Sequence, residues 1–225
     1  MEQHLRPNAQ RARNAIALLW VMLVMEVLML AVNYRYLGLM QRMQGGEVLD
    51  ESTVTSGEAF LGVVALLYVA AFVFAAITFI QWFRRAYFNL HLLTPLLQHG
   101  EGWAAGAWFV PVLNLFRPYQ IMRDMYEVTN VRVGTAGRTT AHVGWWWAFW
   151  VISLCLERIS SRLDMRADDL GEMILSTQFG MAAALMGIPA ALFAVAVVKR
   201  YAAMEPVLAT MPTLASQQIG EVKGA

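Results

Sequence analysis

The sequence predicts an all-α membrane protein with four transmembrane helices. Of its 225 residues, 58% are hydrophobic and 15% are charged, whereas soluble domains average about 45–50% and about 25%. Long apolar runs alternate with charged segments. The formal charge of +1 gives no general attraction for nucleic acid. The single cysteine, Cys155, excludes an intramolecular disulfide.

The four spans are predicted at residues 15–32, 59–83, 139–159 and 173–198, since a hydrocarbon core about 30 Å thick needs about 20 helical residues. The third reaches that length only by including polar residues at both ends. The fourth contains Pro189, which membrane helices tolerate. Basic residues precede the first run, as in a signal peptide, but no small-residue cleavage site follows it. We therefore expect a retained helix.

The positions of Lys and Arg predict the orientation. Of the 17 Lys and Arg residues, twelve lie in the N-terminal arm, the segment between the second and third runs, and the C-terminal tail, and five lie in the other two loops. Cytoplasmic loops carry the excess of Lys and Arg. Both termini are therefore predicted to be cytoplasmic, in a bacterial inner membrane.

Residues 102–128 predict a re-entrant or interfacial hairpin and a short amphipathic helix between the second and third spans. Residues 103–116 are uncharged, too few to span, and contain Pro111. From Pro118 onward, Pro118, Met122, Met125 and Val128 share one helical face, while Arg123, Asp124 and Glu127 lie elsewhere on the wheel. This helix lies either on the inner leaflet or on the protein's own spans. We expect one membrane domain over residues 1–225, with a flexible tail at 205–225.

Two sequence blocks resemble a known family. Residues 79–90 read FIQWFRRAYFNL, residues 102–111 read GWAAGAWFVP, and residues 114–120 read NLFRPYQ. Together with the tryptophans at 145–147 and 150, these blocks resemble the bacterial membrane family DUF4328 over about residues 75–200. The resemblance implies a multi-helix membrane fold and no particular reaction. The long acidic first loop, residues 41–58, matches no fixed family pattern.

Glu26 lies within the first predicted span. An acidic residue at the centre of a membrane helix costs about 2.5–3.5 kcal/mol to insert, so it usually faces a partner, water or a proton path. One interpretation is ion or proton coupling. The favoured one is a protonated or hydrogen-bonded packing residue, because no basic intramembrane partner is evident.

The other candidate residues lie around the predicted inner face. Arg84 and Arg85 follow the second span, where arginines bind lipid phosphates or merely anchor the topology. For Arg84 we favour anchoring. Asn89 belongs to the same block. For Arg85 we favour a structural bond to the segment before Pro111. Asn114 and Arg117 lie beside prolines, where polar side chains satisfy freed backbone groups or line a cavity. The remaining candidates on this segment are Trp103, Trp108, Pro118, Tyr119 and Arg123.

Two further patterns predict packing. Trp145, Trp146, Trp147 and Trp150 suggest an aromatic belt at the inner interface. In the last span, small residues follow one helical face, which favours close packing of helices within the chain over a dimer: Gly180, Ala184, Gly187 and Ala191.

The leading functional hypothesis is a non-enzymatic accessory or interaction component that contacts anionic lipid or a protein partner through its cytoplasmic face. The alternatives are an oligomeric transporter or channel that uses Glu26 and the broken segment near Pro111, and a membrane enzyme acting on a lipid. No phosphate-loop, zinc-protease or hydrolase motif is present. We expect no cofactor, no metal and no nucleic-acid partner.

Overall fold

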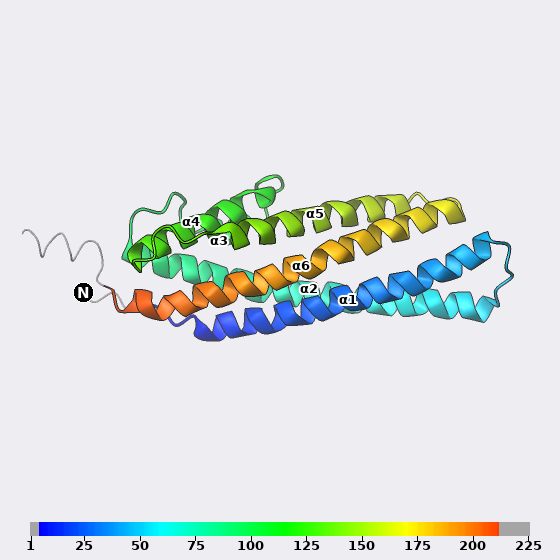
Figure 1. Ribbon diagram of the computed structural model, residues 1–225, viewed down its shortest axis with the longest axis horizontal. Helices are drawn as coiled ribbons and strands as arrows, with labels where there is room; N and C mark the ends of the chain where they lie inside the picture. Colours follow the sequence, from blue (N-terminus) through cyan, green and yellow to red (C-terminus); the bar gives the residue numbers. More distant parts are fainter. Residues whose placement is uncertain (1–4, 212–225) are drawn as a thin grey trace, which may run out of the picture. The chain divides into compact units, whose positions relative to one another are not determined.

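The computed structural model describes residues 5–211, and every regular element in them is a helix (Figure 1). The long helices are α1 (Ala9–Gln44), α2 (Glu51–Leu93), α5 (Ala141–Asp164) and α6 (Leu170–Ala209). Between α2 and α5 lie α3 (Trp103–Gly106), the short 3-10 helix η1 (Leu113–Leu115) and α4 (Arg117–Arg132). The predicted all-α class is confirmed.

The chain divides into two compact units. Within the described residues, unit 1 comprises 5–17, 76–144 and 195–211, and unit 2 comprises 18–75 and 145–194. Each of the four long helices contributes residues to both units. The prediction of a single membrane domain is not tested by this division.

Three helices, α1, α2 and α6, are long and apolar enough to cross a membrane. They contain the first, second and fourth predicted spans, and at 36, 43 and 40 residues they exceed the roughly 20 residues that a bilayer core requires. These helices are longer than the predicted spans because helical structure continues into the polar residues on either side of each apolar run. The third predicted span, residues 139–159, overlaps most of α5, and its crossing of the membrane stays a prediction.

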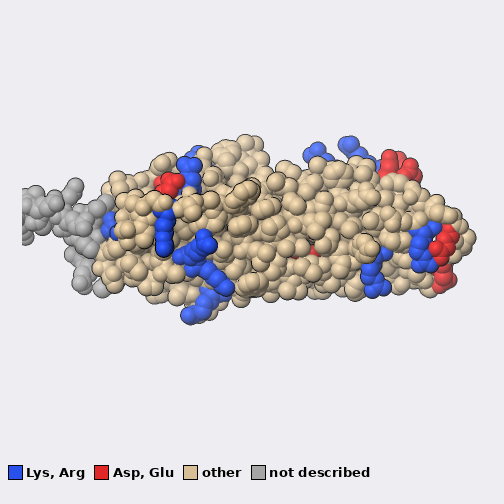
Figure 2. Space-filling model, viewed as in Figure 1, with Lys and Arg blue, Asp and Glu red and all other residues tan. Residues whose placement is uncertain are grey.

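Unit 2 contains two antiparallel helix pairs, residues of α1 with α2 and of α5 with α6, each joined by a short loop (Figure 1). Met25 and Val32 of α1 pack against Val64 of α2. Leu37 and Met40 of α1 pack against Ile174 of α6. On the viewed face of unit 2, charged side chains gather near the two loops, and the rest of that surface is almost uncharged (Figure 2).

The small residues of α6 pack inside the chain, as predicted. A Cβ added at Gly180 would lie 3.2 Å from Oγ of Ser160 on α5, and Ser160 donates a hydrogen bond to the Ser176 carbonyl at 2.8 Å. Ala184 and Ala191 are buried. These positions let neighbouring helices approach α6 closely.

Unit 1 has a dense aromatic core. Trp82 and Phe83 of α2 are completely buried. The Trp82 ring meets Tyr201 of α6 edge-on at 6.0 Å, and the Phe83 ring meets Trp108 at 6.3 Å. The Tyr126 hydroxyl of α4 donates to the Val197 carbonyl at 2.6 Å. The predicted amphipathic helix therefore packs on the protein itself, which was one of its two alternatives.

Three details differ from the sequence-based expectations. Asp124, placed away from the apolar face of α4, is buried because it accepts the Gln98 backbone N–H at 3.1 Å. Trp146 and Trp147 are buried while Trp145 is exposed, so only part of the tryptophan cluster can form a belt. The predicted tail began at 205, but α6 continues to Ala209; residues 212–225 lie outside the described part.

Candidate functional site

Four arginines of unit 1 line one basic pocket. Its volume is about 180 Å³, and its lining residues are Arg6, Arg11, Gln81, Arg84, Arg85, Phe88 and Glu101. Arg85 is within electrostatic reach of Arg11, Arg6 and Arg84. With Glu101 as the single acid in this lining, the pocket carries an excess of positive charge and suits a multivalent anion.

The N-terminal arm is held in place at this pocket by polar contacts. Asn89 of α2 accepts the Arg6 backbone N–H at 3.0 Å and donates to the Arg6 carbonyl at 2.8 Å. The Arg6 guanidinium lies 4.2 Å from the centre of the Phe88 ring, a cation–π distance. Asn8 donates to Glu205 of α6 at 2.8 Å. Asn89 therefore positions an arginine and does not itself line the pocket.

Arginine is suited to this position, because its planar guanidinium binds phosphate through two parallel N–H donors and stays charged. Four like charges in one pocket repel one another, so an anion that neutralises them is favoured. The half-buried Arg85 side chain lies with the other arginines of the pocket. A bond from Arg85 to the segment before Pro111 stays a prediction.

A second pocket of unit 1, of about 250 Å³, is polar and of mixed charge. Its lining residues are Gln98, His99, Arg117, Gln120, Arg123, Asp124 and Glu127. Two of the predicted candidates, Arg117 and Arg123, meet here. Arg123 pairs with Glu127 at 3.3 Å, and the Arg123 guanidinium lies 5.9 Å from the Tyr119 ring centre. Its own acids balance much of its positive charge.

His99 contacts Arg117 directly through Nε2 and a guanidinium nitrogen. Since arginine stays protonated, Nε2 must accept, and the imidazole is neutral. Burial and the neighbouring Arg117 lower the pKa of His99, while Asp124 opposes the shift. The His99 carbonyl accepts the Tyr87 hydroxyl at 2.6 Å. His99 therefore ties the loop after α2 to the start of α4.

The predicted hairpin, residues 103–116, folds as α3, a bent segment and η1. Its small residues Ala104 and Ala107 are buried, whereas the side chains of Phe109 and Val112 are 76% and 68% exposed. Val112 follows Pro111 and has a φ of 68°, a strained conformation for a β-branched residue. Trp103 lies 5.8 Å from the Arg117 guanidinium, and Asn114 is half-buried. The segment thus presents apolar side chains at its bend.

Glu26 lies in unit 2 and is not part of either pocket. It is buried, and its Oε1 accepts the Tyr68 hydroxyl at 2.7 Å. The predicted candidates thus fall into three groups: the basic pocket, the polar pocket with the hairpin, and Glu26. Sequence reasoning missed Arg6 and Arg11, which it counted only as orientation signals. The spacing of Arg6 and Arg11 along the N-terminal arm did not indicate that they lie beside Arg84 and Arg85 of α2.

These observations define a helical membrane protein with a basic pocket and a separate buried acid. The chain belongs to the DUF4328 family, described as a domain of unknown function, whose model matches residues 45–203. This confirms the resemblance and extends it into the first loop. No curated protein and no solved structure matches the chain.

Proposed function

We propose that this protein is a non-enzymatic accessory component of the bacterial inner membrane whose cytoplasmic face binds anionic lipid. The observation that carries the proposal is the convergence of Arg6, Arg11, Arg84 and Arg85 on one pocket. An anionic headgroup bears a phosphate of the charge and size that this pocket suits. A protein partner or a second copy of the chain is the alternative occupant of that face.

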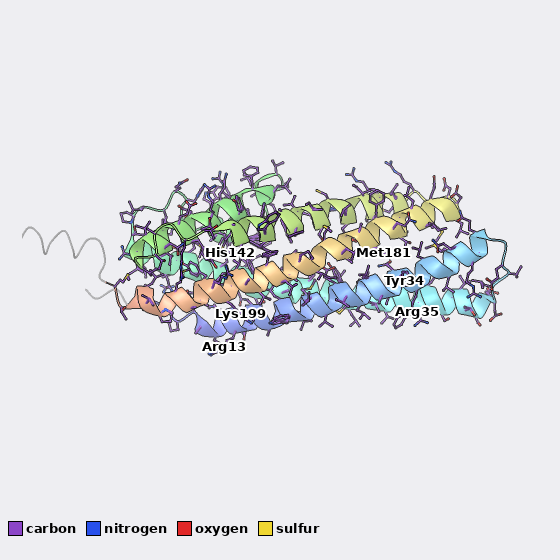
Figure 3. All side chains as sticks on the ribbon, in the orientation of Figure 1. Arg13, Tyr34, Arg35, His142, Met181 and Lys199 are labelled. Atoms are coloured by element: carbon purple, nitrogen blue, oxygen red, sulfur yellow. The ribbon has the colours of Figure 1, made fainter. Side chains whose placement is uncertain are left out.

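The division into two units supports the proposed orientation. Of the twelve Lys and Arg residues predicted to be cytoplasmic, eleven lie in the described part of the chain and all of these belong to unit 1, whereas the five on the other side all belong to unit 2. Arg13 and Lys199, both of unit 1, appear on the viewed face in Figure 3. In this proposal α5 also crosses the membrane, as the third of four spans, which places both termini and the basic pocket in the cytoplasm.

The segment 103–116 supports the same proposal. Exposed apolar side chains beside basic residues are typical of surfaces that meet an anionic bilayer. Phe109 and Val112 would enter the interface as an interfacial or re-entrant hairpin, while the arginines bind headgroups. Arg117 and Arg123 add positive charge to this face, partly balanced by Asp124 and Glu127.

Lipid retention tests the proposal. The purified protein is exchanged into nanodiscs of phosphatidylcholine and phosphatidylglycerol, and the lipids that remain bound are identified by native mass spectrometry. Each pocket arginine contributes about 1 kcal/mol to anionic lipid binding, so Arg84→Gln with Arg85→Gln should lower retained phosphatidylglycerol by about fivefold per arginine. The matched control, Arg158→Gln with Arg162→Gln, removes equal charge from unit 2 and should leave retention unchanged.

Equal retention in wild type and both variants would contradict the lipid site, and a co-purified polypeptide or symmetric oligomer in place of lipid would favour the other occupants. The orientation is tested separately, with Cys155→Ser as the background. A membrane-impermeant maleimide should label Ser52→Cys in intact cells and Arg138→Cys only after permeabilisation. The reverse pattern would contradict the proposed topology.

A further inference from the structure

Glu26 is a buried carboxyl group in a helix that is long and apolar enough to cross a membrane. It lies within the first predicted span, on α1, and only 6% of its surface is exposed. Among the residues that the structure describes, no Lys, Arg or His forms an ion pair with it. Its hydrogen bond comes from the neutral Tyr68 hydroxyl at 2.7 Å. A carboxyl group in hydrocarbon requires either a positively charged partner, if it is ionised, or a bound proton that makes it neutral.

The neighbouring helices hold the carboxyl group without neutralising it. On α2 the facing titratable group is Tyr68, and on α5 it is Glu157, an acid within electrostatic reach. On α6 the facing residue is Gly187, where an added Cβ would come within 2.6 Å of both carboxyl oxygens. Glu157 is itself an acid, so it supplies no positive charge to Glu26.

We propose that Glu26, with the Tyr68 hydroxyl and the α6 backbone at Gly187, forms a proton-binding site within the membrane. The Tyr68 hydroxyl donates to Oε1, and the proton resides on Oε2. Gly187 leaves the space that this carboxyl group occupies against α6. The site belongs to unit 2 alone and is independent of the basic pocket, so either proposal can fail without the other.

Dicyclohexylcarbodiimide tests this site, because this apolar reagent adds to protonated carboxyl groups in membranes. The wild-type protein is treated over a pH series, digested, and mapped by mass spectrometry. We expect one adduct on the peptide that contains Glu26, and its yield should fall as pH rises. Glu26→Gln should lose the adduct, while Glu157→Gln should keep it.

Tyr68→Phe provides a measurement that a purely structural role would not change. The Tyr68 hydrogen bond stabilises the ionised carboxylate, so its removal should shift the labelling curve to higher pH. Gly187→Ala should displace the carboxyl group and reduce the yield severalfold. The wild-type map needs no variant: an unlabelled Glu26 peptide, or labelling independent of pH, would overturn the proposal. Protection by Na⁺ at constant pH would also overturn it, because the site would then hold a cation.

Discussion

The two units differ in where their largest buried side chains lie. Every one of the largest completely buried side chains among the described residues belongs to unit 1, including Trp82, Tyr87 and Tyr201. In unit 2 large apolar side chains such as Val24, Leu66 and Phe74 are exposed. Lipid permits exposed apolar side chains, because lipid tails are as apolar as leucine, whereas an aqueous surrounding favours their burial.

This difference indicates that the two units are stabilised by different interactions. Unit 1 gains stability by removing aromatic surface from its surroundings. Unit 2 gains less in that way, so close contact at small residues and a few buried polar groups hold its helices together. Gly180, Gly187 and Ser160 are such positions. Four predictions test this comparison, from the largest effect to the smallest.

The first compares two leucines of α2. Leu90 of unit 1 is 1% exposed and Leu66 of unit 2 is 73% exposed. Leu90→Ala should lower the free energy of unfolding by about 2–5 kcal/mol, since it leaves a cavity. Leu66→Ala should change it by less than about 0.5 kcal/mol. Chemical unfolding in detergent micelles measures both, and equal losses would refute the difference between the units.

The second compares two glycines within unit 2. Gly187→Ala places a methyl group against the Glu26 carboxyl group and should cost about 1–3 kcal/mol, typical of overpacking. A Cβ at Gly62 meets nothing within 4 Å, so Gly62→Ala should be neutral or stabilising by up to about 1 kcal/mol. Thermal unfolding of the two variants decides. If Gly187→Ala is also neutral, close approach at α6 contributes little to unit 2.

The third concerns a buried hydrogen bond of unit 1. Tyr126→Phe removes the donor to the Val197 carbonyl and should cost about 0.5–1.5 kcal/mol. The control is Tyr34→Phe in unit 2. The Tyr34 side chain is exposed (Figure 3), so the loss of its hydroxyl group should have no measurable effect on stability. A similar change in melting temperature for both variants would show that the Tyr126 bond adds no specific stability.

The fourth is a pH effect. Burial and Arg117 lower the pKa of His99 in the folded protein, so the unfolded chain binds the proton more readily. Stability should therefore fall as pH drops through about 6.5, the ordinary histidine value. The His99→Gln variant has no histidine to protonate at this position, so its melting temperature should fall less than that of the wild type between about pH 7.5 and about pH 5.5. An identical loss in wild type and variant would exclude His99 as the cause.

The sequence by itself determined the class, the helices and the family. Apolar runs must be helical in a bilayer, because the backbone has no water to satisfy its N–H and C=O groups. Pro118 marked the beginning of α4, where a proline needs no N–H partner. The blocks at 79–90 and 102–120 identified the family. All of these are local signals, readable from neighbouring residues.

Only the tertiary structure decided which residues meet. Arg6 and Arg11 join Arg84 and Arg85 because Asn89 binds the backbone of a segment far away in the sequence. Asp124 is buried because a loop N–H reaches it. Gly187 lies against Glu26 because α1 and α6 pack closely. Such contacts depend on how the helices pack in three dimensions. The periodic spacing of apolar residues along one helix shows which face is buried, but it does not specify which other residues that face contacts.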